Sequence, residues 1–396
     1  MRGTIGLMCH DSWGGSARTA MELGEQLAVN GCSVHTFTLS PPKSVRIGAK
    51  SYTSHSVYSW EQMGRHPAVL YREWTDEHYE AFFEILQHEI KKHQIELLHY
   101  HYVVPFAKIA ADIRESDKFP DLRIVGTLHG TDVTKPPRST VYADGLRNSL
   151  MRADILTTVS INHANLSKEV FKLDAPPVVI PDFVNSSRYE PGKRQKSVKA
   201  DHLKRPRIVH ISNFRAVKRP DQAVEIFSGI RATLDSELWF VGDGPMRAEV
   251  EALAEDFRLE DDIRFLGLTH EVPEILADSD LVLVTSREES FCLAALEGMM
   301  MGVPVLAPEL GGLPELITHG ESGLLYPPDA PAAAIKEAVE ILTNPEKWHR
   351  IGTEAVKKVS SFSREIVTAK YETLYRDLLR DCPASAQLAR PSKGRM

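Results

Sequence analysis

The chain has 396 residues and a formal net charge of −7. This length exceeds that of one ordinary hydrophobic core, so we expect two domains of similar size. Its 42% hydrophobic and 26% charged residues are typical of a soluble globular protein, and the negative charge argues against a nucleic-acid-binding protein. No apolar run is long enough to span a membrane and the first residues do not resemble a signal peptide, so we expect a cytoplasmic protein without a transmembrane segment.

The cysteines are Cys9, Cys32, Cys292 and Cys382, and they are scattered without a C-x-x-C motif. This spacing fits a reducing compartment such as the cytosol. It predicts neither a disulfide framework nor a cysteine metal site.

The first half of the sequence alternates strand-like apolar runs with segments of helical periodicity. The predicted strands cover residues 4–9, 33–39, 97–102, 124–128, 154–160 and 177–181, and a long helix is predicted over 77–92. Residues 43–72 are polar and are predicted to be irregular. This alternation predicts an α/β fold with a doubly wound parallel sheet.

The glycine pair Gly14-Gly15, followed by Ser16, lies between the first strand and the next helix. Glycine lets a ligand approach the backbone, and the helix N-terminus attracts an anion. The turn could therefore bind a phosphate or a carboxylate. A tight strand-to-helix turn without a ligand is at least as good an interpretation.

Histidines occur near the ends of two predicted strands. His99 and His101 share one face of their strand, but no third ligand stands at a diagnostic spacing, so hydrogen-bonding histidines are favoured over a metal site. The run His129-Gly130-Thr131-Asp132 has the composition of a ligand-binding loop. The alternative is a capped turn in which Thr131 or Asp132 begins a helix.

Residues 186–207 are basic and without periodicity, which indicates a solvated linker between domains. A second strand and helix series follows, with strands predicted over 207–212, 238–241, 263–267, 281–284 and 304–307. The loop 213–220 carries Arg215, Lys218 and Arg219 ahead of a helix, and such a loop suits a diphosphate or is a surface turn. Asp278-Ser279-Asp280 is interpreted as a structural helix end rather than a metal-binding D-x-D motif.

Two glutamates stand eight positions apart in the stretch 286–305. Glu289 precedes a predicted helix and Glu297 lies within it, so both carboxylates should lie near one face. The stretch follows a buried strand, and the carboxyl ends of parallel strands are where α/β folds bind ligands. The alternative is an amphipathic helix with two surface glutamates.

Five motifs stand in a characteristic order along the second half of the chain. They are His-Ile-Ser-Asn-Phe-Arg-Ala-Val-Lys-Arg (210–219), Val-Gly-Asp-Gly-Pro (241–245), Arg-Phe-Leu-Gly (264–267), Glu-Ser-Phe (289–291) with Glu297, and Gly-Gly-Leu-Pro-Glu (311–315). In this order the chain resembles the retaining GT-B glycosyltransferases. With Gly-Gly-Ser (14–16), His-Tyr-His-Tyr (99–102) and Thr-Leu-His-Gly-Thr-Asp (127–132), it is most similar to the N-acetylglucosaminyl L-malate synthase group of bacillithiol biosynthesis.

The resemblance implies two Rossmann-like domains that face each other across a cleft. Residues 1–183 would bind the acceptor, residues 184–363 would bind the nucleotide sugar, helix 364–381 would pack back onto the first domain, and 382–396 would form a polar tail. The implied reaction moves N-acetylglucosamine from UDP-GlcNAc, with retention, onto L-malate or another small hydroxylated acceptor. The resemblance implies neither a metal nor a further cofactor. The partners would be small-molecule substrates, and a homo-oligomer is possible.

The resemblance also implies roles for individual residues. His129, Lys218 and Glu289 would be catalytic. The donor would be bound by Gly14, Gly15, Asn213, Arg215, Lys218, Gly242, Leu266, Glu289, Phe291, Cys292, Leu293 and Glu297. The acceptor would be bound by Ser16, Tyr102, Thr127 and Arg215.

Some residues depart from the family pattern. Cys292 and Gly298 stand where relatives usually have glycine and alanine, and Arg18 adds a cation beside the glycine pair. A nucleotide-sugar epimerase, a phosphorylase or a non-catalytic binding protein could share the fold. The glutamate pair together with the Arg/Lys loop favours sugar transfer.

Overall fold

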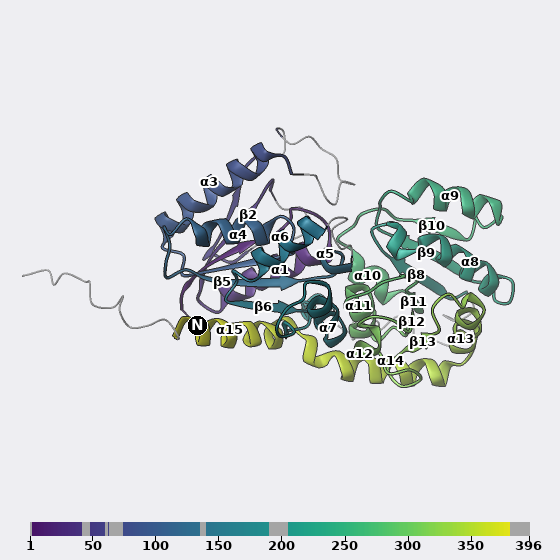
Figure 1. Ribbon diagram of the computed structural model, residues 1–396. Coiled ribbons are helices and arrows are strands. Elements are labelled where there is room, and N and C mark those ends of the chain that lie inside the picture. Colours follow the sequence, from purple (N-terminus) through teal and green to yellow (C-terminus); the bar gives the residue numbers. More distant parts are fainter. Residues whose placement is uncertain are drawn as a thin grey trace, which may run out of the picture.

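The computed structural model describes residues 2–41, 48–59, 62, 74–134, 140–189 and 205–380. Two parallel sheets, each covered by helices, lie side by side (Figure 1). This arrangement confirms the predicted α/β class with two Rossmann-like units. The predicted tail at 382–396, Cys382 and most of the basic segment 186–207 lie outside the described residues.

The first sheet has the strand order β3-β2-β1-β4-β5-β6-β7, and its strand pairings within the described residues are parallel. Its strands are β1 (Thr4–Met8), β2 (Ser33–Thr38), β3 (Tyr52–Ser56), β4 (Leu97–His101), β5 (Arg123–Leu128), β6 (Ile155–Thr158) and β7 (Val178–Val179). The helices among them are α1 (Gly15–Val29), α3 (Asp76–His93), α4 (Phe106–Glu115), α5 (Thr131–Thr134), α6 (Thr140–Leu150) and α7 (Ile161–Val170).

The second sheet has the order β10-β9-β8-β11-β12-β13, again with parallel pairings. Its strands are β8 (Arg207–Ile211), β9 (Glu237–Val241), β10 (Ile263–Phe265), β11 (Leu281–Leu283), β12 (Val305–Pro308) and β13 (Leu324–Tyr326). Its helices are η3 (Ala216–Lys218), α8 (Pro220–Arg231), α9 (Arg247–Asp256), α10 (Val272–Ala277), α11 (Leu293–Met300), α12 (Leu313–Leu316), α13 (Pro331–Thr343), α14 (Pro345–Val359) and η4 (Ser360–Phe362).

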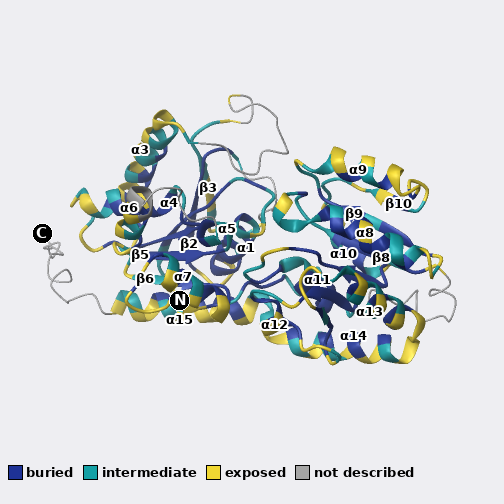
Figure 2. Cartoon of the chain, turned by 45° about the vertical axis from the view of Figure 1, so that its right-hand side comes forward, coloured by how far each residue is buried: buried dark blue, intermediate teal, exposed yellow. Residues whose placement is uncertain are grey.

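Apolar side chains cover both faces of the first sheet. Met8 and Leu98 pack with residues of α3, α4 and α6, whereas their neighbours Leu7 and Leu97 pack with residues of α1 and of the last helix. The central strands β1, β2, β4 and β5 are therefore buried on both faces, as the blue strands of Figure 2 show. This explains why they appear in the sequence as continuous apolar runs.

The last helix, α15 (Arg364–Arg380), returns to the first sheet (Figure 1). Tyr371 and Tyr375 are buried in the same cluster as Ile5 and Leu7, and the Tyr375 hydroxyl lies 2.6 Å from His99 Nδ1. The chain thus crosses between the two units a second time, which ties them together at one side of the cleft.

Two strands were not predicted, β3 at one edge of the first sheet and β13 at one edge of the second. β3 lies within residues 43–72, which the sequence indicated to be irregular, and it pairs with β2 at the edge of the sheet. Its residues are Tyr-Thr-Ser-His-Ser and are mostly intermediate or exposed. A polar edge strand lacks the apolar run that marks buried strands.

Among the helices of the described residues, none is both long and apolar enough to cross a membrane.

In each sheet the strand order reverses direction next to the first strand of the unit, at β1/β4 and at β8/β11. Doubly wound sheets bind ligands at the carboxyl ends of the strands beside such a reversal. The loops that follow β1, β8 and β11 are therefore where a site is expected, and these loops contain the glycine pair, the Arg/Lys loop and Glu289.

Candidate active site

A cavity of about 310 Å³ lies between the two units and is lined by the loops after β1, β5, β8 and β9 and by the start of α11. Most of the predicted site residues line it: Gly14, Gly15, Ser16, Tyr102, His129, Asn213, Arg215, Lys218, Gly242, Glu289, Cys292, Leu293 and Glu297. Residues from both halves of the chain therefore converge on one cleft.

Three predicted site residues do not line this cavity. Thr127, near the end of β5, is fully buried, and its hydroxyl lies 2.6 Å from both His99 Nε2 and Thr157 Oγ1. Phe291 packs in the core, with its ring centroid 5.6 Å from that of Phe362. Leu266 lies outside the cavity and donates its N–H to the Phe240 carbonyl at 2.9 Å.

Glu289 forms a partly buried ion pair with Lys218. The Lys218 Nζ donates to Glu289 Oε1 at 2.7 Å, and the Ser286 hydroxyl donates to the same oxygen at 2.7 Å. Burial alone would lower the pKa of Lys218, but the adjacent Glu289 carboxylate outweighs it, so this pKa is raised. The ammonium group therefore stays charged in the cavity.

Glu297 forms a second ion pair, and this one crosses the cleft. Arg18 of α1 donates to Glu297 Oε1, and the Tyr189 hydroxyl donates to the same oxygen at 2.5 Å. Glu297 is 2% exposed, and Arg18 and Tyr189 both contact its Oε1. A ligand that uses this carboxylate must compete with Arg18.

The three cationic side chains of the loop between β8 and α8 lie in different positions. Arg215 and Lys218 line the cavity, whereas Arg219 does not and donates to Asp329 at 2.7 Å. The chain conformation explains this division, because Arg219 has a left-handed backbone (φ 46°) between η3 and α8. Of the two arginines that the sequence offered as partners of Lys218, the geometry favours Arg215.

Further contacts close the cleft. The Ser290 hydroxyl donates to the His129 carbonyl, and the Glu315 carboxylate accepts the N–H groups of Ile161 at 2.8 Å and Asn162 at 2.7 Å, at the start of α7. A carboxylate at a helix N-terminus is stabilised by the helix dipole. The two units are therefore in direct contact around the cavity.

His129 is held as a neutral side chain. Burial lowers its pKa well below the usual value, and the neighbouring His101 and His163 lower it further. Its Nε2 lies 3.0 Å from His101 Nδ1. Asp132 holds the loop by accepting the backbone N–H of Gly130 at 2.6 Å and that of His129 at 3.2 Å, and α5 begins at Thr131 directly after this loop.

Asp182 is a cavity residue that the sequence did not single out. It lines the cavity, and its Oδ1 lies 3.8 Å from His129 Nδ1. Burial raises its pKa to about 7, against the opposing effects of a Thr19 hydrogen bond and the Arg18 charge. Its only sequence signal is its position, since a polar residue directly after a predicted parallel strand lies at the carboxyl edge of the sheet.

Two motif glycines hold the site loops close to each other. A Cβ on Gly311, whose φ is 56°, would lie 1.9 Å from the Glu289 carbonyl oxygen, and a Cβ on Gly242, whose φ is 115°, would lie 1.8 Å from that of Ser212. Side chains are excluded at both positions by backbone contact and by conformation. These glycines therefore shape the loops that carry Glu289 and Asn213.

The helix α11 begins at an unusual residue. Its N-cap, Cys292, has φ 85° and ψ 84°, a left-handed region that costs a non-glycine residue roughly 1–2 kcal/mol. Burial raises the pKa of the Cys292 thiol, and the neighbouring Glu289 carboxylate raises it further. The side chain is therefore a thiol at neutral pH and is not an activated nucleophile.

Asp280 is part of the fold and not of the cavity. It is 4% exposed, and its carboxylate accepts the backbone N–H of Arg207 at 2.9 Å. This confirms the structural interpretation of Asp278-Ser279-Asp280.

Comparisons with known proteins agree with this geometry. The family model "Glycosyl transferases group 1" matches residues 193–358, and "Glycosyltransferase Family 4" matches residues 13–188. The chain is 32% identical to the N-acetyl-alpha-D-glucosaminyl L-malate synthase of Bacillus anthracis, over 96% of this chain and 98% of that protein. The chain belongs to the GT-B glycosyltransferases.

Solved structures share the fold of this glycosyltransferase. A sucrose-phosphate synthase from Thermosynechococcus elongatus has a TM-score of 0.80 at 22% identity and covers 96% of this chain and 99% of that one. The Anabaena protein HepE, solved in complex with UDP, has a TM-score of 0.71 at 17% identity and covers 95% of this chain and 100% of that one. At these identities the likeness shows the fold alone.

The backbone at Cys292 leads to a stability prediction. Cys292→Gly should be more stable than Cys292→Ala by about 1 kcal/mol, because glycine adopts a left-handed backbone without the Cβ clash. Both variants lose the thiol, so their difference isolates the backbone effect. Denaturant unfolding measures it, and an alanine variant equal to or more stable than the glycine variant would show that the position carries no such strain.

The raised pKa of Asp182 predicts a pH-dependent stability. Between pH 4 and 7 the folded chain keeps a proton on Asp182 that the unfolded chain releases, so this residue should make the wild type lose stability as pH rises through this window. The amide of an Asp182→Asn variant would stay neutral in both states. The melting temperature of Asp182→Asn should therefore exceed that of the wild type by an amount that grows from pH 4 to 7. The exposed control Glu260→Gln should show no such pH-dependent gain. A difference for Asp182→Asn that stays constant with pH would contradict the raised pKa.

Proposed function

We propose that this glycosyltransferase transfers N-acetylglucosamine from UDP-GlcNAc, with retention of configuration, to the hydroxyl of a small anionic acceptor, and that L-malate is the first acceptor to test. The observation that carries the proposal is the pair of buried carboxylates, Glu289 and Glu297, that face a cation-bearing loop in one cleft. The choice of sugar and acceptor comes from the malate synthase of Bacillus anthracis, with its 32% identity over nearly the whole chain.

The second unit supplies the groups that a nucleotide sugar needs. Glu297 would accept hydrogen bonds from the ribose hydroxyls, and Lys218 with Arg215 would neutralise the diphosphate. Glu289 would hold a sugar hydroxyl beside the first turn of α11, where free N–H groups favour negative charge. His129 would reach the sugar from the first unit, as a neutral hydrogen-bonding group.

The acceptor would enter from the side of the first unit. Arg215 and Tyr102 line the cavity described above and also a second cavity of about 1710 Å³ beside it. A guanidinium group is a suitable partner for an acceptor carboxylate, and Ser16 lines the first cavity next to the glycine pair. Thr127 is not included in this proposal, because its hydroxyl is bonded below the cavity floor.

The proposed chemistry breaks the bond between the anomeric carbon and the diphosphate and forms a bond from that carbon to the acceptor oxygen on the same face. The leaving phosphate oxygen takes the acceptor's proton, so the products are UDP and the glycoside. Fixed cations at the leaving group stabilise the charge that develops there. Closure of the two units positions the reactants and excludes water.

An acceptor panel tests the reaction. The purified chain, UDP-GlcNAc and a set of small hydroxy acids, each with and without chelator, should release UDP only when an acceptor is present, with L-malate the best. The NMR coupling of the product's anomeric proton should show the same configuration as the donor. UDP-GlcNAc that is epimerised without an acceptor would support the epimerase instead, and loss of activity with chelator that added metal restores would contradict a metal-free mechanism.

Lys218 and its neighbour Arg219 provide a matched pair of variants. Lys218→Ala should lower kcat by about 100-fold or more, because it removes a charge that stabilises the leaving group. Arg219→Ala should leave kcat near the wild-type value, since this side chain points to Asp329 outside the cavity. Circular dichroism and melting temperature confirm folding of both; wild-type turnover in folded Lys218→Ala would remove Lys218 from the diphosphate site.

A further inference from the structure

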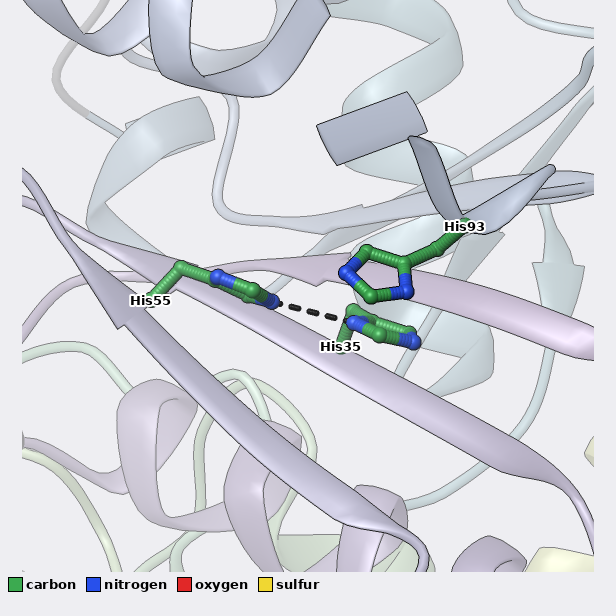
Figure 3. A group of neighbouring side chains, drawn as sticks. All are labelled: His35, His55 and His93. Atoms are coloured by element: carbon green, nitrogen blue, oxygen red, sulfur yellow. Dashed lines mark hydrogen bonds between the residues drawn. The ribbon is translucent and has the colours of Figure 1, made fainter. Parts of the chain in front are cut away.

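Three histidines form a compact group in the first unit, outside the candidate active site. His35 comes from β2, His55 from the edge strand β3, and His93 from the last residue of α3 (Figure 3). One ring nitrogen of each lies within 4.8 Å of those of the other two. None of the three lines either cavity, and within the described residues this is the one such group of histidines, cysteines and carboxylates.

The spacing of the first two rings is that of metal ligands. His35 Nδ1 and His55 Nε2 lie 3.0 Å apart, as the dashed line in Figure 3 shows. Two nitrogens bound to one tetrahedral zinc ion at about 2.0–2.1 Å lie roughly 3.3 Å from each other. The two nitrogens therefore need only a small movement to share an ion, and His93, with 32% of its side chain exposed, has room to rotate toward them.

Oxygen atoms surround the outer sides of the rings. Glu89 Oε2 lies 2.9 Å from His93 Nε2 and 3.7 Å from His55 Nδ1, and the Ser33 hydroxyl lies 3.3 Å from His35 Nε2. Metal-bound histidines typically donate their second ring N–H to such oxygens, which fixes the tautomer and the orientation of the ring. The Glu89 carboxylate lies next to the group, and Lys92 Nζ also contacts this carboxylate at 3.2 Å.

The protonation of the group suits a metal ion as well. Burial, with smaller contributions from the neighbouring His93 and His55, lowers the pKa of His35 to about 4. Burial also lowers the pKa of His55, although Glu89 opposes this effect. Both rings are therefore neutral at pH 7, and the neutral imidazole is the form that binds metals.

We propose that His35, His55 and His93 form a binding site for a divalent transition-metal ion, with zinc as the best match to three imidazoles. The ion would join β2, the edge strand β3 and the C-terminal end of α3, which are separate segments of the chain. Its role is structural, because the site lies away from the cavity where transfer is proposed. The sequence predicted no metal, since these histidines are too far apart in the chain to form a recognisable motif.

Metal titration of the full chain tests the site. After treatment with chelator and dialysis, Zn²⁺ is added in competition with a chromophoric chelator, and Co²⁺ is added to record the visible spectrum of a tetrahedral site. We expect one equivalent of tight binding, a tetrahedral Co²⁺ spectrum, and a melting temperature that rises with Zn²⁺. Turnover should not depend on the ion, which separates this proposal from the proposed function.

Variants identify the ligands. His93→Gln and His55→Gln should each weaken Zn²⁺ binding by at least roughly 10- to 100-fold. Loss of a residue that only holds a ligand in place already costs this much, and these variants lose a ligand itself. The matched control is His88→Gln, which changes an exposed histidine of the same helix that lies 3.7 Å from the same Glu89, and it should bind as the wild type does.

Two outcomes would overturn the metal site. The first is an absence of stoichiometric Zn²⁺ binding by the wild-type chain. The second is unchanged affinity in a folded His93→Gln variant, which would show that Zn²⁺ binds adventitiously to surface histidines. His93 is partly exposed at the end of α3, so this variant should fold even where His55→Gln does not.

Discussion

Two buried carboxylates, each neutralised by a cation from another part of the chain, are the constraint on which this site depends. Glu289 pairs with Lys218 within the second unit, and Glu297 pairs with Arg18 across the cleft. Removing one partner of a buried pair typically costs about 3–5 kcal/mol, because it leaves an unpaired charge. The second pair joins the two units, so separating them would break it.

The surrounding backbone is arranged to hold these carboxylates. Gly311 allows its loop to contact the Glu289 carbonyl, and the neighbouring Gly312 donates its N–H to that same oxygen at 2.9 Å. Cys292 turns the chain into α11 in a left-handed conformation that normally selects glycine. In this chain, the loop around Glu289 therefore depends on close backbone contacts.

Local patterns predicted much of the fold and part of the site. Buried parallel strands appear as apolar runs, and the spacing of Glu289 and Glu297 placed both side chains in the cavity. Contacts between distant segments could not be predicted, such as Arg18 with Glu297, which are 279 positions apart, or the histidines of β2, β3 and α3. The burial of individual side chains could not be predicted either. Thr127 and His129 lie two positions apart, but only His129 lines the cavity.

A crystal structure of the chain grown with UDP tests most directly whether this cleft is the donor site. We expect the ribose hydroxyls within hydrogen-bond distance of the Glu297 carboxylate, with Arg18 displaced from it. The diphosphate should contact Lys218 and Arg215. UDP bound outside this cavity, or bound with the Arg18–Glu297 pair intact and the ribose elsewhere, would contradict the proposed role of the two carboxylates.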